Sequence, residues 1–301
     1  MDATRYLTVI ADDFGIGPAT SRGILDLAAS GVITGTVLLV NSPYAPDAVR
    51  AWRRCGAGLE VGWHPCLTMD PPVCPAREVP SLVGPDGCLW PLRAFLPRLL
   101  AGLVRPAEIE RELRAQYDRF RELTGAPPGL VNSHQHVALF PPVGRVLRAV
   151  LAGCRPRPYL RRVREPWGML ARVPGARLKR AVLNCLGRLE AHRQGRAGLP
   201  GQEWLAGLPD PPWGRDPAYF VRWLTRIPGR DVELACHPGY HDPTLIGRDC
   251  GPDDGLLPRR DDELDLLRRP SFPAACRDAG FTLGSPSEWL ARRSEGVRHA
   301  A

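Results

Sequence analysis

The chain has 301 residues, of which 44% are hydrophobic and 24% charged, and its formal net charge is +8. This composition supports a packed core and excludes a disordered chain, and the length fits one large α/β barrel or two ordinary domains. No stretch approaches the roughly 20 apolar residues that cross a bilayer, and no two of the nine cysteines form a CxxC pair. We therefore expect a soluble, cytoplasmic protein without a transmembrane segment, a disulfide framework or a zinc ribbon.

Almost all of the positive charge is arginine, because Lys179 is the only lysine. A basic protein can bind nucleic acid, phosphate or an anionic membrane surface. Here the arginines are spread along expected helices and are not interleaved with stacking aromatic residues, which favours a solvated surface, so no nucleic-acid partner is expected. The local exception is a basic cluster made of Arg155, Arg157, Arg161, Arg162 and Arg164.

The first half of the chain alternates strand and helix patterns. Residues 6–11 form a nearly continuous apolar, β-branched run that is typical of a strand buried on both faces. The clearest helix pattern begins with Pro106 in its first turn and ends before Gly125. The expected order is strand 6–11, helix 19–29, strand 35–40, helix 45–54, strand 59–64, loop 69–91, helix 106–123, strand 129–133 and helix 142–152.

The second half is harder to interpret. A fifth strand is expected over 159–163, but most of the segment 155–215 predicts only an insertion or lid with a basic amphipathic helix near 175–190. The expected elements after it are strand 232–236, helix 261–268, strand 281–283 and a helix from about residue 287.

This alternation predicts parallel βα units in a single domain spanning residues 1–301. Glycine-rich dinucleotide and phosphate-loop signatures are absent, which favours a barrel over an open nucleotide-binding sheet. Polar residues gather where the expected strands end, at the edge where such folds bind ligands. They are Asp12, Asp13, His64, His134, His136 and His237.

Histidines and a carboxylate that converge from separate strands are typical of a catalytic divalent-metal site. Of the adjacent pair Asp12 and Asp13, one could bind the metal while the other accepts a proton from water. Of His134 and His136, one could be a ligand and the other a supporting residue, or both could bind. His237 lies before Pro-Gly on a late strand, where it could protonate a leaving amine.

Four sequence motifs, in this order and spacing, resemble the YdjC/ChbG-like carbohydrate deacetylases, including the branch associated with hopanoid biosynthesis. The motifs are Ala11-Asp12-Asp13-Phe14-Gly15, Gly62-Trp63-His64-Pro65-Cys66-Leu67-Thr68, Asn132-Ser133-His134-Gln135-His136-Val137 and Cys236-His237-Pro238-Gly239-Tyr240. The match covers residues 6–150 and 230–290.

The resemblance implies an irregular or incomplete TIM-like (β/α) barrel with parallel strands. It implies a hydrolase that removes the acetyl group from an N-acetylated amino sugar or glycoconjugate of the N-acetylglucosamine type. By motif, Asp12 is the base, His237 is the acid, and one divalent metal ion, Mg²⁺ or Zn²⁺, is bound by Asp13, His64 and His134. Other motif side chains are expected to contact substrate or support the ligands: His136, Phe14, Trp63 and Tyr240. Family members often pair, so a homodimer is expected.

The sequence departs from the family at two places. Pro65-Cys66 follows His64 where Leu-Asn is usual, and Ala138 stands where a further histidine often occurs. Both changes leave the ligands in place but alter the surroundings of the metal, so the substrate could differ from chitobiose-like sugars. Two alternatives remain: a metal-dependent phosphoesterase helped by the basic cluster, and a non-enzymatic basic protein that binds nucleic acid or anionic lipid.

Overall fold

The computed structural model describes residues 5–56, 58–208, 215–253 and 255–299. The strands are β1 (Arg5–Phe14), β2 (Gly35–Leu38), β3 (Glu60–Trp63), β4 (Leu130–Val131), β5 (Tyr159–Leu160), β6 (Trp204–Ala206), β7 (Asp231–Cys236) and β8 (Phe281–Leu283). The α-helices are α1 (Pro18–Ala29), α2 (Ala45–Cys55), α3 (Leu92–Leu100), α4 (Pro106–Thr124), α5 (Pro141–Ala152), α6 (Trp167–Arg172), α7 (Arg177–Arg196), α8 (Tyr219–Leu224), α9 (Leu256–Arg268), α10 (Ser271–Asp278) and α11 (Pro286–His299).

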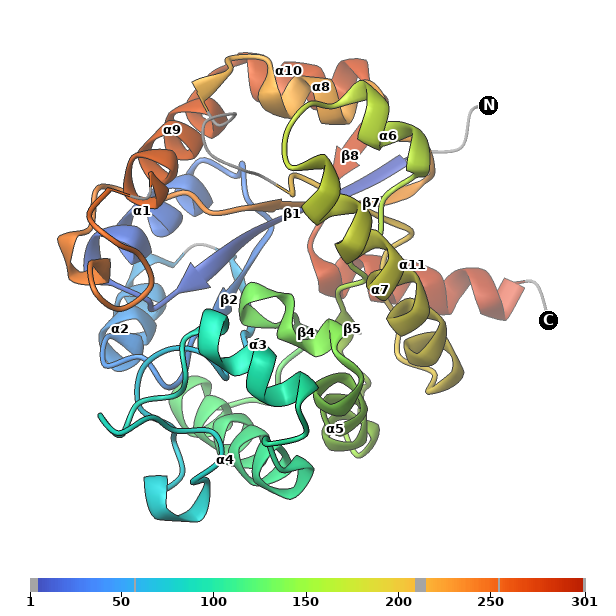
Figure 1. Cartoon of the computed structure of the whole chain (residues 1–301). Helices are drawn as coiled ribbons and strands as arrows, with labels where there is room; N and C mark the ends of the chain where they lie inside the picture. The colour runs from blue at the N-terminus through green and yellow to red at the C-terminus, as the bar shows by residue number, and fades with distance from the viewer. Residues whose placement is uncertain (1–4, 57, 209–214, 254, 300–301) are drawn as a thin grey trace.

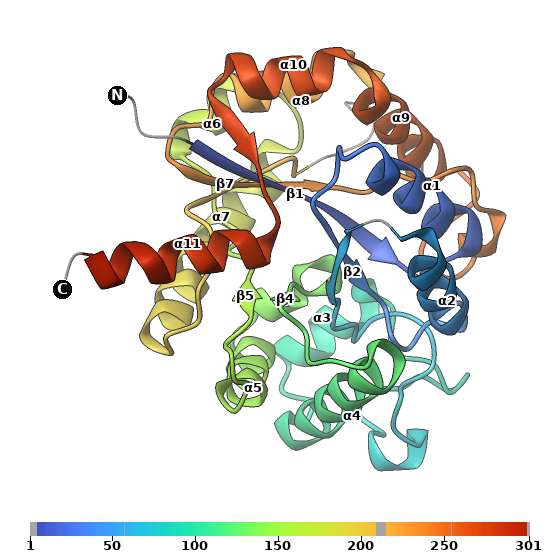
Figure 2. The same ribbon diagram turned by 180° about the vertical axis from the view of Figure 1, so that it is seen from behind.

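The strands form one parallel sheet in the order β5-β4-β3-β2-β1-β7-β6, and β8 pairs with the first residues of β1. Seven of these strands curl through 244°, and helices surround them (Figures 1 and 2). Beside the two outer strands, the N–H of Leu160 donates to the Pro200 carbonyl, and the N–H of Leu205 donates to the Arg164 carbonyl, both at 2.8 Å. The expected incomplete TIM-like barrel with parallel strands is confirmed.

Strand β1 runs through the centre of the sheet and separates two hydrophobic layers. Its alternate side chains Leu7 and Val9 pack in the large core that includes the surrounding helices, whereas Ile10 points the other way. Ile10 belongs to a cluster inside the barrel that also contains Val37, Leu130, Tyr159 and Trp289. Trp289 comes from α11 and packs edge-on against Tyr159, with 5.2 Å between ring centroids. Helix α11 therefore closes the amino-terminal end of the barrel.

Helix α4 fixes the chain that follows β3. Three buried polar side chains, spaced four residues apart on this helix, bond to backbone groups of the long loop. Gln116 pairs with both the N–H and the carbonyl of Cys66, Glu112 accepts the N–H groups of residues 73 and 74, and Glu108 accepts that of Ser81. These bonds satisfy buried backbone groups that would otherwise be costly, and they hold the loop beside the site without placing it on the cavity wall.

The boundaries differ from the sequence predictions where strands meet the site. β4 and β5 are shorter than expected, and the residues that directly follow them, Asn132 and Arg161, both donate to Asp12. The segment 155–215 contributes β5 and β6 to the sheet, and it contains helices α6 and α7. Residues 209–214 of the expected lid lie outside the described residues. Helix α3 was not expected, because Pro97 interrupts its pattern. No described helix is long and apolar enough to span a membrane.

Candidate metal centre and active-site cavity

Asp12 and Asp13 lie at the carboxyl end of β1, and both line the same cavity. Neighbouring side chains of a regular strand point to opposite faces, and Asp12 shares the inward face of Ile10. Asp13 adopts a left-handed conformation with φ 67°, which Asp tolerates better than most residues. This break in the strand geometry is what allows two adjacent carboxylates to serve one site.

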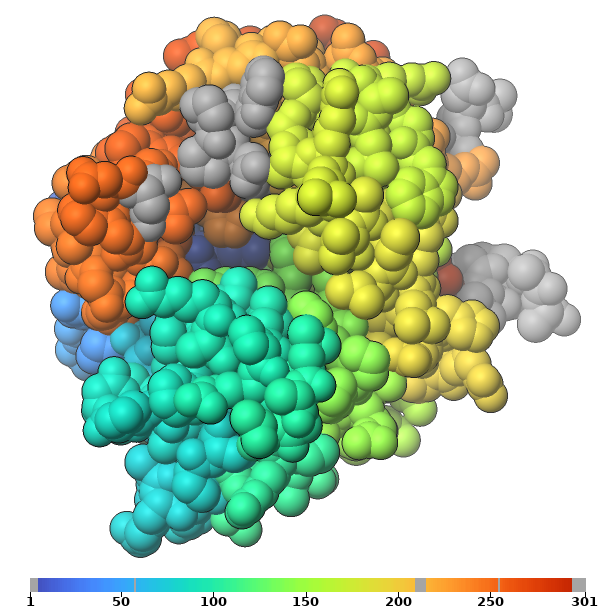
Figure 3. All heavy atoms as spheres, in the orientation of Figure 1, coloured from blue at the N-terminus to red at the C-terminus, as the bar shows by residue number. Residues whose placement is uncertain are grey.

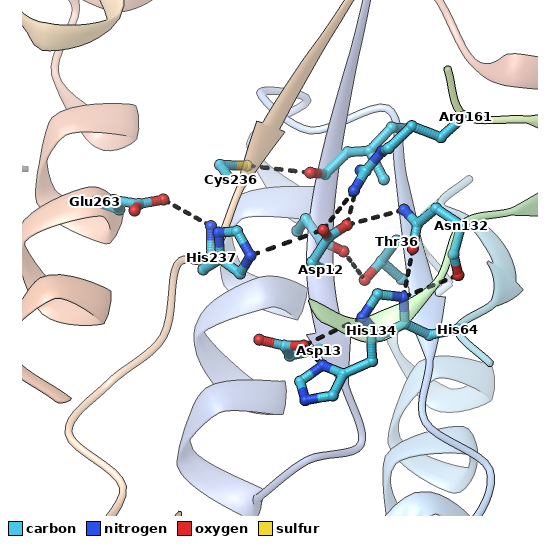
Figure 4. A network of polar contacts seen from close by, with 12 residues as sticks. Asp12, Asp13, Thr36, His64, Asn132, His134, Arg161, Cys236, His237 and Glu263 are labelled. Atoms are coloured by element: carbon cyan, nitrogen blue, oxygen red, sulfur yellow. Dashed lines mark hydrogen bonds and ion pairs between the residues drawn. The ribbon is translucent and has the colours of Figure 1, made fainter. Parts of the chain in front are cut away.

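Asp13, His64 and His134 bring three ligand atoms within 4.8 Å of one another, and all three residues are buried. The Oδ1 atom of Asp13 lies 3.3 Å from Nε2 of His64 and 3.1 Å from Nδ1 of His134. His64 follows β3 directly, and His134 starts the short 3-10 turn after β4, so three strand ends meet here (Figure 4). These are the three residues that the sequence assigned to the metal.

Asn132 fixes the proton of His64. Its amide nitrogen donates to Oδ1 of Asp12 at 3.0 Å, so its amide oxygen faces Nδ1 of His64 and accepts a hydrogen bond from it, as does its backbone oxygen. The ring proton therefore lies on Nδ1, and Nε2 presents its lone pair to the Asp13 carboxylate. Two acceptors in this arrangement repel each other unless a cation lies between them. The donor set of one carboxylate and two imidazoles thus fits a divalent metal ion.

Two residues that the sequence analysis did not assign complete the surroundings of this cluster. Arg260 donates to Oδ2 of Asp13 at 2.7 Å and to Asp249 at 3.2 Å, and Asp249 lies 3.5 Å from Nε2 of His134. Burial raises the pKa of Asp13, but Arg260 and the two histidines outweigh it and hold that pKa well below the usual range. Burial lowers the pKa of His134, yet the negative groups nearby, Asp13 and Asp249 among them, raise it well above its ordinary value. The cluster therefore attracts positive charge.

Asp12 is held by a forked contact with Arg161. Two guanidinium nitrogens of Arg161 donate to the two carboxylate oxygens of Asp12, at 2.5 and 2.8 Å (Figure 4). A third donates to Glu233. The hydroxyl of Tyr159 also donates to Glu233, at 2.7 Å. Burial alone would raise the pKa of Asp12, but Arg161 lowers it well below the usual range, so Asp12 is ionised. This bidentate geometry fixes the direction of both oxygens.

His237 lies on the other side of Asp12, with Nε2 at 3.7 Å from Oδ2 of Asp12. Arg259 donates to Nδ1 at 2.8 Å, and Glu263 accepts the backbone N–H of His237 at 2.6 Å. Because Nδ1 accepts a hydrogen bond, the neutral ring carries its proton on Nε2, facing the cavity. Burial and the positive charge of Arg259 lower the pKa of His237 to about 4, so the ring is neutral at pH 7.

A cavity of about 510 Å³ opens above these residues. Its floor is polar, with Asp12, Asp13, His64, His134 and His237, and its upper wall is largely apolar. The apolar wall consists of Leu92, Leu96, Phe140, Val182, Leu183, Leu208 and Leu256. Figure 3 shows the hollow between the teal atoms around α3 and the yellow atoms of α6 and α7. An opening of this size accommodates a small polar ligand group at its base.

The other motif residues divide into two groups. His136 lines the cavity, in a left-handed conformation with φ 56°, and burial together with Arg161 lowers its pKa to about 3. Phe14 and Trp63 are fully buried in the hydrophobic core. The hydroxyl of Tyr240 donates to Asp26 at 2.6 Å, away from the cavity. The structure therefore places His136 on the cavity wall and the other three elsewhere.

The basic cluster of residues 155–164 does not face the cavity. Arg161 binds Asp12 and Glu233, and the other members donate to backbone carbonyls of the chain. The alternative of a phosphoesterase helped by this cluster therefore has no support in the geometry of the cluster. Pro65, Cys66 and Ala138, where the sequence departs from the family, also lie behind the cavity wall, and the carbonyl of Pro65 accepts the N–H of His134 at 3.0 Å.

Sequence reasoning missed several residues of this site. Asn132 stands inside a quoted motif, and its position beside the histidine was the only available signal. Arg161 was noted only as one member of a basic cluster, because its partner Asp12 is 149 positions away and no spacing rule connects them. Asp249 and Arg260 lie outside the four motifs, and nothing in the local sequence marks them.

Comparison with known proteins adds an independent line of support. The family model described as YdjC-like protein matches residues 6–278. A carbohydrate deacetylase of Mus musculus is 39% identical over 97% of this chain and 97% of its own length. A chitooligosaccharide deacetylase of Serratia marcescens is 31% identical over 93% of this chain and 98% of its own length.

One solved structure supports the fold. It is a protein of Enterococcus faecalis V583 to which cellobiose-phosphate cleavage has been provisionally attributed. It superposes with a TM-score of 0.77 at 23% identity and covers 95% of this chain and 99% of its own. At that identity the likeness extends to the arrangement of the strands and helices.

Proposed function

This chain belongs to the YdjC-like protein family, and from that membership we propose that it is a metal-dependent deacetylase of N-acetylated amino sugars. The observation that carries the proposal is the cluster of Asp13, His64 and His134 on the cavity floor, next to the ionised Asp12. The proposed substrate is a sugar or glycoconjugate with an acetamido group of the N-acetylglucosamine type, as the names of the relatives suggest. The homodimer and the cytoplasmic location stay predictions.

Asp13, His64 and His134 would hold one divalent ion, Mg²⁺ or Zn²⁺. Such an ion polarises a carbonyl oxygen and makes a nearby water more acidic. Asn132 keeps the lone pair of His64 directed at this position, and Arg260 keeps the Asp13 carboxylate ionised. The protein thus supplies an orienting group for each of these two ligands.

Asp12 is the proposed base. Its carboxylate is ionised and oriented by Arg161 and Asn132, and it lies beside the cluster without belonging to it. It can take the proton of a water molecule that attacks the acetyl carbon. General-base catalysis of this kind typically contributes 10²–10⁴-fold, as an order-of-magnitude figure.

His237 is the proposed acid for the departing amine. In the free protein it is neutral and presents Nε2–H, so it first serves as a hydrogen-bond donor to the substrate. To act as an acid it must take up a second proton from solvent at Nδ1, which requires that Nδ1 release the hydrogen bond from Arg259, and it then passes the Nε2 proton to the leaving amine. Negative charge that develops in the cavity during the attack favours this change.

The proposal is tested with metal-stripped protein reconstituted with single divalent ions. A panel of N-acetylated sugars, with the matching amino sugars as blanks, is assayed for released acetate. We expect acetate release that depends on the added ion and on the acetamido group. Stoichiometric metal binding without acetate release from any member of the panel would count against the proposed reaction.

A further inference from the structure

The exposed hydrophobic side chains are concentrated in two segments that flank the cavity and contribute to its lining. Seven large ones are exposed in the described part of the chain, and six of these lie in residues 91–105 and 166–189, which we call the rim. They are Leu100, Leu103, Trp167, Leu178, Val182 and Leu189. Leu178 is 80% exposed and Leu100 76%. Single exposed apolar residues are ordinary, but their concentration around one opening indicates a contact surface.

The two parts of the rim lie on the same face of the molecule. Figures 1 and 2 agree that α3, α6 and α7 lie on one side, and Figure 3 shows the hollow between them. On α3, Leu92 and Leu96 line the cavity, and Leu100, one further turn along the same helical face, is exposed. On α7, Val182 lines the cavity and is also exposed. The apolar cavity wall therefore continues outward onto the surface.

The rim also accounts for the net charge of the chain. Its 39 residues contain eight cationic side chains and no aspartate or glutamate, whereas the remaining 262 residues contain 32 of each sign. The cationic residues are Arg93, Arg98, Arg105, Arg172, Arg177, Lys179, Arg180 and Arg188. Arg180 is buried against Glu165, and most of the others are exposed or half-buried. These two segments thus carry a net charge of +8 in the sequence, of which the charge of Arg180 is balanced by Glu165, just outside the second segment.

We propose that the rim docks on an anionic lipid bilayer, with the cavity opening toward the membrane. Leucine and tryptophan side chains that enter the interface, surrounded by arginines that contact acidic headgroups, are the features of peripheral membrane binding. A second copy of this chain fits the rim poorly, because two such surfaces would bring like charges together. A nucleic acid also fits poorly, since Trp167 is the only exposed aromatic side chain of the rim and the leucines would stay in water.

The test is flotation of the full chain with vesicles of phosphatidylcholine alone or mixed equally with phosphatidylglycerol. We expect binding to the mixed vesicles that weakens with added salt, and much weaker binding to phosphatidylcholine. Equal binding to both vesicles, or binding to neither, overturns the proposal. Binding to single-stranded RNA that is tighter than binding to mixed vesicles and is lost in the same variants would overturn it in favour of a nucleic-acid partner.

Two pairs of variants sharpen the test. Leu100→Ser combined with Leu178→Ser should weaken vesicle binding about tenfold or more, because two apolar side chains no longer enter the interface. Arg93→Glu combined with Arg177→Glu should weaken it by more than about tenfold, since each charge near the surface changes binding about fivefold. The matched controls are Ile246→Ser and Arg54→Glu, which alter an exposed hydrophobic and an exposed arginine outside the rim.

None of the four substituted rim residues lines the cavity, so acetate release from a soluble sugar should be unchanged in these variants. The two proposals can therefore fail separately: vesicle binding does not depend on turnover, and turnover on a soluble substrate does not depend on vesicles. Sedimentation that shows a dimer in the wild type and a monomer in the leucine variant, without vesicle binding by either, would assign the rim to a second copy instead.

Discussion

The floor and the rim of the cavity differ in how their charged side chains are placed and paired. On the floor, each charged group is buried and meets an opposite charge or a hydrogen-bond partner from a distant strand, as Asp12 does with Arg161. On the rim, apolar and cationic side chains extend into solvent, and no acidic residue accompanies them. Buried charges need compensation within the fold, whereas an exposed basic and apolar surface is free to contact a partner outside it.

This contrast predicts that substitutions on the floor and substitutions on the rim change different measured properties. Floor variants should change metal binding, turnover or the free energy of unfolding. Rim variants should leave all three close to wild type and change association with surfaces.

The largest effect is expected for the metal ligands. His64→Ala combined with His134→Ala removes two of the three ligand groups, so ion binding and acetate release should both fall to background. Metal content after reconstitution and released acetate are the two measurements. His192→Ala, on the exposed side of α7, is the matched control. A double variant that retains one ion per chain and normal turnover would show that the ligands are elsewhere.

The next effect concerns the base. Asp12→Asn keeps the size and most of the contacts of the side chain, so the metal should remain while kcat falls about 10²–10⁴-fold. Asp26→Asn, at the half-exposed contact with Arg268, serves as the control. The comparison is a kcat measurement with metal content determined on the same samples. Near-normal turnover of the Asp12 variant would rule out its role as base.

Loss of a buried counter-charge is expected to act on stability. Arg161→Gln leaves Asp12 and Glu233 buried without their cation, which should lower the free energy of unfolding by about 3–5 kcal/mol in urea titrations. Arg268→Gln removes a half-exposed pair with Asp26 and should cost clearly less. If both variants lose the same amount, the Asp12 network is no more important for stability than a peripheral ion pair.

A smaller effect follows from the pKa of His237, which the fold lowers to about 4. Between pH 6.5 and 4 the imidazole of His237 is protonated in the unfolded chain and neutral in the folded chain. The free energy of unfolding therefore decreases as the pH falls through this range. The contribution reaches about 1–2 kcal/mol at pH 5. His237→Gln should therefore lose less stability than the wild type between pH 7 and pH 5. Identical pH dependence in both proteins would contradict the lowered pKa.

The smallest effect is expected on the rim. Leu100→Ser combined with Leu178→Ser should change the free energy of unfolding by no more than about 0.5 kcal/mol, because both side chains are already in solvent. Turnover on soluble sugars should stay within about twofold of wild type. A large loss of either would mean that the rim is part of the folded core and not a separate contact surface.

The sequence predicted those parts of the fold whose signals are local. The apolar run of β1, the bounded pattern of α4 and the polar residues at strand ends all arise from short-range periodicity. Helix α3 was missed because Pro97 breaks its pattern, and β6 because it lies in the segment 155–215, whose sequence beyond the expected strand 159–163 predicted only an insertion or lid with one helix. The motifs gave Asp13, His64 and His134, which the structure brings together.

The contacts of the site that could not be predicted are those formed only when the sheet curls into the barrel. Arg161, Glu233 and Arg260 reach the aspartates only after strands far apart in the chain become neighbours, so no spacing rule could identify them. Phe14 and Trp63 illustrate the reverse error. A motif keeps side chains that pack behind a site as well as those that line it, and only burial tells the two kinds apart.

The contact of Arg161 with Asp12 also has a consequence for folding during translation. Asp12 and Asp13 are among the first residues to be synthesised, whereas Arg161 follows Asp12 by 149 positions and Arg260 follows Asp13 by 247. Until those arginines emerge, burial of the end of β1 leaves two carboxylates without their cations, which strongly disfavours it. Strand β1 is therefore synthesised early, but it can be stably buried in the barrel only near the end of translation. A chain that is released early should keep that strand exposed, which makes it an easy target for quality-control proteases.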